Sequence, residues 1–260
     1  MSAPPSHAVP RRAALGVAAA AGLAACARAA STQPLAAQAQ AQAPGRVVLL
    51  GDSVFDNAGY LRGSGPDVVA QLGARLPPGW GATLLARGGA VAADVPGQLG
   101  RLPPDATHLV ISAGGNDAGR REGVLGEPAR SVADGLARIA ALRDGFARDY
   151  RAMLDAALGR GLPVAVCTIY DPRFPEPGRR RVAVVALAAF NDVITREAFA
   201  RGMPLLDLRL VCGQDEDFAA PTGPSTRGGA KIAAEIARWA GGHDPARRRS
   251  LVFAGGEGGG

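Results

Sequence analysis

The chain is poor in several residue types that would indicate other classes of protein. Aromatic residues make up 5% of the 260 residues, and Lys231 is the only lysine, so arginine carries almost all of the positive charge. The arginines are scattered, with local clusters at 179–181 and 247–249. Nucleic-acid binding favours a basic stripe with interleaved aromatics, so we expect no nucleic-acid partner. The sequence has no Cys/His pattern for zinc, and we expect neither a metal nor a cofactor.

The chain also has no apolar run long enough to cross a membrane near its N-terminus. The apolar segment 13–25 is too short for a mature membrane helix. It follows an arginine pair at 11–12 and ends in small residues, which is the pattern of a secretory signal. Residues 23–26 resemble a bacterial lipobox, in which Cys26 becomes the lipidated first residue and anchors the protein to a membrane. Cleavage at an Ala-x-Ala site instead would give a soluble periplasmic or secreted protein.

The composition along the chain predicts one folded domain between two tails. Residues 1–26 are the predicted signal peptide, and residues 27–45, rich in Ala, Gln and Pro, form a flexible tether. The folded domain is expected over 46–240. Residues 241–260 are rich in Gly and Arg and are expected to be a disordered tail. The sequence does not determine the oligomeric state.

Alternating strands and helices predict an α/β fold. Apolar runs predict five strands, at 46–50, 82–86, 107–112, 163–169 and 204–208. Helical stretches fall between them, at 66–76, 94–101, 129–160, 180–202 and 226–240. Strands that alternate with helices form a parallel sheet covered on both faces, so we expect a three-layer α/β/α sandwich with five parallel strands.

Cysteines other than Cys26 are few. Cys167 and Cys212 each lie near the end of a predicted strand, and those strands are expected to be neighbours. In an oxidising compartment they can pair if their Cα atoms lie within about 7 Å. Two buried free thiols are the alternative that we expect.

A serine follows the first predicted strand directly. Residues 50–57 read Leu-Gly-Asp-Ser-Val-Phe-Asp-Asn, after the apolar run 46–50. The Ser53 hydroxyl is thereby expected at the carboxyl edge of the sheet, where open α/β folds bind their ligands. The alternative is a turn in which Ser53 only caps a helix.

Two further segments have a related design. Residues 109–117 read Leu-Val-Ile-Ser-Ala-Gly-Gly-Asn-Asp, and a glycine-rich stretch at 86–95 follows the second strand. With the Gly-Asp-Ser segment they resemble the first three blocks of the GDSL/SGNH hydrolase family. The resemblance implies a flavodoxin-like fold and ester hydrolysis, with Ser53 as nucleophile and the Gly89 amide and Asn116 side chain as oxyanion donors. The alternatives are a plain turn glycine at Gly89 and a structural role for Asn116.

The last block of the family is degenerate here. Residues 219–233 resemble that block through Pro-Ser and Gly-Gly-Ala-Lys-Ile-Ala. The family's histidine should stand just before Pro224, where this chain has Gly223, and its aspartate three residues earlier, where it has Ala220. A serine without a general base is a poor nucleophile. A Gly223→His variant is therefore expected to raise ester turnover if the site geometry is intact.

No other histidine is placed to substitute. His7 lies in the predicted signal. His108 opens the third strand, about 25 Å before Asn116 at strand spacing. His243 follows the last helix, whose far end should lie about 22 Å from the site. We therefore expect none of the three to reach Ser53.

Nearby carboxylates are the candidates for an alternative base. Asp56 and Asp117 lie close in sequence to Ser53 and Asn116, and Asp217 precedes the last block. Desolvation can raise a carboxyl pKa toward neutrality, so any of the three could act as the base. Asp52, Asp56 and Asp117 together can also hold a divalent ion, although no ligand spacing demands one.

Two functions remain open from the sequence. The first is a serine hydrolase of lipid, small acyl or acetylated-glycan esters, with a non-standard base. The second is a catalytically inactive descendant that binds an ester or a cell-envelope glycan.

Overall fold

The computed structural model describes residues 44–244 and 250–255. The predicted signal peptide with Cys26, almost all of the predicted tether, and His7 lie outside the described residues. Within the described residues, no helix combines the length and apolar character needed to cross a membrane.

A parallel sheet forms the centre of the fold, with strand order β2-β1-β3-β4-β5-β8. Its strands are β1 (Arg46–Gly51), β2 (Gly81–Leu84), β3 (His108–Ser112), β4 (Val164–Cys167), β5 (Leu205–Leu206) and β8 (Val252–Phe253). The first five correspond to the five predicted apolar runs. Their order is that of flavodoxin-like sheets, so the predicted α/β/α class is confirmed.

The sixth strand corrects two predictions. The sheet was expected to have five strands, and residues 241–260 were expected to be disordered. Instead β8 pairs with β5 in parallel, and the amides of Leu205 and Asp207 each donate a hydrogen bond of 2.8 Å to the carbonyls of Leu251 and Phe253. The run of large apolar residues that carries this strand, Leu251-Val252-Phe253, is only three residues long, which is shorter than the about four to eight residues by which a strand is recognised in a sequence.

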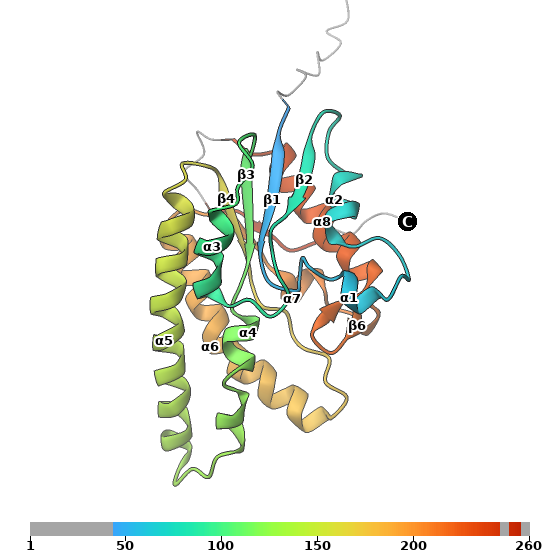
Figure 1. Cartoon of the computed structure of the whole chain (residues 1–260). Helices are drawn as coiled ribbons and strands as arrows, with labels where there is room; N and C mark the ends of the chain where they lie inside the picture. The colour runs from blue at the N-terminus through green and yellow to red at the C-terminus, as the bar shows by residue number, and fades with distance from the viewer. Residues whose placement is uncertain (1–43, 245–249, 256–260) are drawn as a thin grey trace, which may run out of the picture. The chain divides into compact units, whose positions relative to one another are not determined.

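Helices cover both faces of the sheet (Figure 1). One face carries α3 (Val95–Leu99), α5 (Val132–Leu158) and α6 (Pro177–Ala200). The other carries α2 (Val68–Gly73), α7 (Leu208–Val211) and α8 (Thr226–Gly241). The remaining elements are α1 (Ala58–Leu61), α4 (Gly115–Gly119), the 3₁₀ turns η1 (Ala92–Asp94), η2 (Glu122–Gly126) and η3 (Asp215–Asp217), and the hairpin β6 (Phe218–Ala220) and β7 (Gly223–Pro224).

Alternate residues of each strand point into two separate cores, because side chains alternate across a strand. In β1, Val48 and Leu50 pack with α3, α5 and α6, whereas Val47 and Leu49 pack with α2, α7 and α8. All four are fully buried. A strand buried on both faces reads as a continuous apolar run, which explains the run before Gly51.

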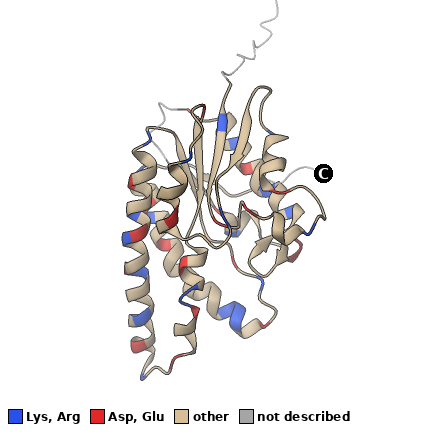
Figure 2. Ribbon diagram, viewed as in Figure 1, with Lys and Arg blue, Asp and Glu red and all other residues tan. Residues whose placement is uncertain are grey.

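Charged residues of both signs are interspersed along α5 (Figure 2). Two ion pairs link this helix to α6: Arg143 to Asp192 at 3.0 Å and Arg151 to Glu197 at 2.7 Å. Exposed pairs of this kind contribute at most about 1 kcal/mol each, so the cores provide most of the stability.

Both cysteines within the described residues are free and buried, as expected. Cys167 ends β4, but Cys212 follows α7 and not a strand, which differs from the prediction. Burial raises the pKa of the Cys212 thiol to about 12, so this cysteine is a protonated core residue at neutral pH.

Candidate active site

Gly51 brings the first and third strands together just before Ser53. Gly51 pairs with Ser112 across β1 and β3, and its φ of 109° lies in the region that favours glycine. A Cβ atom at this position would lie 1.7 Å from the carbonyl oxygen of Ser112. The Gln98 side chain holds the Gly51 backbone through two hydrogen bonds. The Gly51 amide donates to Gln98 Oε1 at 2.6 Å, and Gln98 Nε2 donates to the Gly51 carbonyl at 2.8 Å. This close approach requires the glycine of Gly-Asp-Ser.

Ser53 and Asn116 line one pocket of about 330 Å³ at the carboxyl ends of β1 and β3. The volume is within the usual range for ligand pockets. Asn116 lies in α4, and its side-chain amide donates a 2.9 Å hydrogen bond to the carbonyl of Ala90. The structure therefore brings together the serine and the asparagine that the sequence singled out.

The glycine-rich segment after β2 forms a tight turn beside Ser53. The Ala90 amide donates to the Arg87 carbonyl at 3.1 Å, and Gly89 has a φ of 81°, as the third residue of a type II turn requires. Gly88 lies close to Ser53, since a Cβ atom on Gly88 would lie 3.9 Å from the serine Cβ. Within the described residues the Gly89 amide has no hydrogen-bond acceptor.

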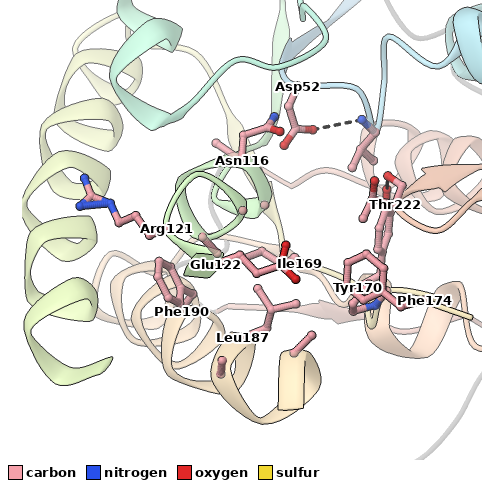
Figure 3. Close-up of a pocket in the computed structure, with 18 of the residues that line it drawn as sticks. Asp52, Asn116, Arg121, Glu122, Ile169, Tyr170, Phe174, Leu187, Phe190 and Thr222 are labelled. Atoms are coloured by element: carbon pink, nitrogen blue, oxygen red, sulfur yellow. Dashed lines mark hydrogen bonds between the residues drawn. The ribbon is translucent and has the colours of Figure 1, made fainter. Parts of the chain in front are cut away.

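Asp52 lies buried beside Ser53 and also lines the pocket (Figure 3). Its Oδ1 atom accepts hydrogen bonds of 3.1 Å from the Val54 amide and from the Ser112 hydroxyl. Burial, which disfavours the charged form, raises the Asp52 pKa to about 7 despite these bonds, and the negative charge of Asp117 adds to the rise. A neutral Asp52 carboxyl is therefore present in much of the protein near neutral pH.

The far side of the pocket is apolar. Figure 3 shows Leu187 and Phe190 opposite Asp52 and Asn116. The apolar lining comes from η2, α5, α6 and the segment after β4, and includes Leu125, Ile139, Leu142, Ile169, Leu187 and Phe190.

An ion pair links η2 to the start of α6 at the edge of this pocket. Arg179 binds Glu122 through two hydrogen bonds, of 2.8 and 3.1 Å. The Arg179 guanidinium also lies 3.8 Å from the ring centroid of Phe174. All three residues line the pocket, so the pair helps to fix its wall.

The two nearest candidate bases each bind a backbone amide. One Asp56 oxygen accepts from the Gly88 amide at 2.8 Å. Both Asp117 oxygens face the Ala92 amide, at 3.1 and 3.4 Å, and burial raises the Asp117 pKa. Neither aspartate lines the Ser53 pocket. Within residues 44–244 and 250–255, no three His, Cys, Asp or Glu side chains are arranged to hold a metal ion.

The third candidate, Asp217, lies just before the last block and forms structural ion pairs with two residues of α8. Its fully buried carboxylate lies 2.7 Å from the Lys231 ammonium and 3.4 Å from the Arg227 guanidinium. It also accepts a 3.0 Å hydrogen bond from the Gln214 amide. Asp217 does not line the Ser53 pocket, and Arg227 and Lys231 of α8 compensate its charge.

The backbone of the last block is present without its two polar side chains. Ala220 and Gly223 are paired across the β6–β7 hairpin, directly before Ser225, which caps α8. Tyr60 covers this hairpin: a Cβ atom on Gly223 would lie 2.5 Å from carbon atoms of its ring. The Tyr60 hydroxyl donates a 3.1 Å hydrogen bond to the Ser53 Oγ.

The two described histidines lie at the opposite edge of the sheet, as predicted. His108 is the first residue of β3, and its ring centroid lies 5.6 Å from that of His243. Trp80 and Trp239 flank His108 at 5.2 and 5.3 Å. Burial and, to a smaller extent, the nearby His243 lower the pKa of His108 to about 4.

Sequence reasoning missed Tyr60, Asn57 and Gln98, and it considered Asp52 only as a metal ligand. All three missed residues act through contacts with segments distant in the sequence, so periodicity gives no sign of them. One sequence feature could have pointed to Tyr60. Gly223 stands in the position of the family's histidine, and in a close-packed protein another side chain must fill the space that the glycine leaves.

Comparison with known proteins now identifies the class. The model of the GDSL-like lipase/acylhydrolase family matches residues 49–230, and the chain belongs to this family. Its members are in general hydrolases of ester bonds. No curated protein sequence matches the chain.

Solved structures of similar fold include lipases and an esterase. An extracellular lipase from Streptomyces rimosus is 21% identical, with a TM-score of 0.55, and the match covers 74% of this chain and 99% of that one. The lipase Lip_vut3 from a goat rumen metagenome is 17% identical, with a TM-score of 0.60 and coverages of 78% and 100%. The acetyl xylan esterase AlAXEase is 16% identical, with a TM-score of 0.53 and coverages of 76% and 100%. At these identities the likeness concerns the fold.

Proposed function

We propose that the protein is a serine hydrolase of carboxylic esters, with Ser53 as the nucleophile. The observation that carries this proposal is the shared pocket of about 330 Å³, which Ser53 and Asn116 both line together with apolar side chains. Attack by the Ser53 oxygen on the ester carbonyl gives a tetrahedral oxyanion. Expulsion of the alcohol leaves an acyl-serine, which water then hydrolyses.

Three groups are candidate donors to that oxyanion, of which Ser53 and Asn116 line the pocket and Gly89 lies in the turn beside it. Within the described residues the backbone amides of Ser53 and Gly89 have no hydrogen-bond acceptor. Asn116 uses one amide hydrogen on the Ala90 carbonyl and keeps the other. Preorganised donors of this kind stabilise the transition state, and loss of one costs on the order of 3 kcal/mol. We therefore propose the Gly89 amide and the Asn116 side chain as oxyanion donors, as the family resemblance implies.

The apolar wall favours esters with an apolar acyl group. Leucine, isoleucine and phenylalanine side chains line the cavity away from Ser53, and they give no partner to sugar hydroxyls. We therefore favour lipid or small acyl esters over acetylated glycans. Two reported structures of similar fold are lipases, and one of them is described as extracellular. An extracellular relative fits the secretory pattern before residue 26. We therefore propose that this protein is exported, with or without a lipid at Cys26.

A second function has its own supporting observation. Gly223 and Ala220 stand where the family has histidine and aspartate. A protein without these groups that binds an ester in the same pocket and leaves it intact is the competing proposal.

Hydrolysis of p-nitrophenyl acetate and butyrate by the full chain, beside Ser53→Ala, separates the two. Turnover that disappears in the variant supports the hydrolase. Equal background rates in both proteins contradict it and favour the binding protein.

A further inference from the structure

Tyr60 occupies the place in which a side chain at position 223 would lie. Gly223 is buried, and atoms of the Tyr60 ring lie 2.5 to 2.7 Å from the Cβ position that Gly223 lacks. The hydroxyl end of the same ring is 3.1 Å from the Ser53 Oγ. Among the described residues it is the one hydrogen-bond partner of that oxygen. One aromatic side chain thus fills the space at Gly223 and contacts the nucleophile.

The fold holds Tyr60 in this position from both sides. Tyr60 lies in α1, which begins after the fully buried Asn57. The Asn57 side chain donates to the carbonyl of Pro224 at 3.2 Å, so it ties the start of α1 to the residue after Gly223. The turn of the hairpin is held as well, because the Tyr170 hydroxyl donates to the Thr222 carbonyl at 2.5 Å. The contact between Tyr60 and Gly223 is therefore part of a fixed junction.

We propose that Tyr60 is the catalytic proton-transfer residue of Ser53 and stands in for the missing histidine. This inference rests on the proposed hydrolase function. A phenol hydroxyl both donates and accepts, so a neutral Tyr60 can relay a proton without an ionised form. No carboxylate or histidine is then required at the nucleophile.

Tyr60 gives up one proton and takes up one proton in each of the two half-reactions. As the Ser53 oxygen bonds to the ester carbonyl carbon, its proton passes to the Tyr60 oxygen, and the Tyr60 proton passes to the leaving alkoxy oxygen as the C–O bond breaks. In deacylation, water attacks the acyl carbon and gives its proton to Tyr60, while Tyr60 returns a proton to the Ser53 oxygen. Tyr60 is neutral before and after each step, and the products are the alcohol and the carboxylic acid.

A Tyr60→Phe substitution tests the relay, because it removes the hydroxyl and keeps the ring on Gly223. Positioned acid–base groups contribute about 10²–10⁴-fold, so we expect turnover of p-nitrophenyl butyrate by the full chain to fall at least about 10²-fold with little change in KM. Tyr150→Phe is the matched control. Tyr150 is fully buried outside the pocket, and its hydroxyl has no partner in the described part of the chain, so this variant should retain the parent turnover.

The outcomes separate this proposal from the one on which it rests. Parent turnover that does not depend on Ser53 overturns the hydrolase function, and the relay with it. Turnover that depends on Ser53 but survives Tyr60→Phe overturns the relay alone.

An exchange of the two side chains gives a second test. Gly223→His alone should give no gain, since its Cβ collides with the Tyr60 ring. Tyr60→Ala combined with Gly223→His should exceed Tyr60→Ala alone by at least about tenfold, and its rate should rise with pH near the ordinary histidine pKa of about 6.5. A double variant no faster than Tyr60→Ala, or a faster single Gly223→His variant, contradicts the claim that the two side chains share one place.

Discussion

The Asn57 side-chain amide donates a hydrogen bond of 3.2 Å to the carbonyl oxygen of Pro224, which joins the first and last blocks of the family motif. The side-chain oxygen Oδ1 of Asn57 accepts from the Val68 backbone amide at 3.0 Å. A single buried side chain therefore links the segment after Ser53, the start of α2 and the hairpin that ends at Pro224. This link explains why Tyr60 lies over Gly223.

Asn57→Ala is expected to destabilise the fold and to release Tyr60. The substitution leaves the Val68 amide and the Pro224 carbonyl without partners, and each unsatisfied buried group costs about 1–3 kcal/mol. We expect the free energy of unfolding in urea to fall by about 2–4 kcal/mol. Under native conditions, Ser53-dependent turnover should fall by more than the fraction of folded protein does. Unchanged unfolding would show that solvent replaces both bonds.

Gly51→Ala is expected to prevent the native junction between β1 and β3. The new methyl group would lie 1.7 Å from the Ser112 carbonyl oxygen, at a φ of 109° that alanine avoids. We expect a loss of more than about 3 kcal/mol, or insoluble protein, since overpacking and backbone strain add.

Gly97→Ala is the matched control for this substitution. Gly97 lies inside α3, and nothing within 4 Å faces its missing Cβ. Alanine is the better helix former, so this variant should gain up to about 1 kcal/mol. Thermal unfolding of both variants measures the contrast, and a similar loss in the two would contradict the close approach at Gly51.

Asp52 is expected to make the protein less stable as the pH rises from about 4 to about 7. Its pKa is about 7 in the folded chain, against an ordinary value of 3.8. Between these values the folded state keeps a proton that the unfolded chain has lost, so the free energy of unfolding falls as pH rises from about 4 to about 7. Asp52→Asn removes this dependence and should be more stable than the parent above pH 7, by up to about 4 kcal/mol. Urea unfolding at several pH values measures the difference, which is absent if Asp52 ionises normally.

His108 should act in the opposite direction over nearly the same range. Its folded pKa of about 4 lies below the ordinary 6.5, so the unfolded chain binds the extra proton between these values. Stability is then lost as pH falls from about 6.5 to about 4. His108→Phe keeps an aromatic ring between Trp80 and Trp239 and should remove this loss. Unfolding followed by tryptophan fluorescence reports directly on this cluster, and parallel pH profiles for variant and parent would refute the assignment.

The parts of the fold that the sequence predicted are those that leave a local pattern. Strands buried on both faces read as apolar runs, and the carboxyl ends of neighbouring parallel strands meet at one edge. For that reason Ser53 and Asn116 could be placed together before any coordinates. The tight turn at Gly89 was likewise visible as a glycine-rich segment after β2.

The parts that escaped prediction depend on contacts between distant segments. The burial of Asp52 depends on Ser112 in the neighbouring strand, and the role of Tyr60 depends on a glycine in the last block. The expected gain from Gly223→His followed from the motif alone, and the Tyr60 ring reverses that expectation. A missing catalytic side chain is therefore informative only when the occupant of its space is known.

The apolar wall of the pocket should set a preference for the length of the acyl chain. Each buried methylene contributes about 0.8 kcal/mol, so kcat/KM for p-nitrophenyl esters should rise about fourfold per added methylene until the cavity is full. Leu187→Trp replaces a leucine of the wall with a larger side chain that fills part of the cavity. It should abolish the rise in kcat/KM with chain length while retaining hydrolysis of the acetate. Leu210→Trp is the control, because Leu210 is 63% exposed and lies outside the pocket. If both variants keep the parent's dependence of kcat/KM on acyl chain length, the acyl group binds elsewhere.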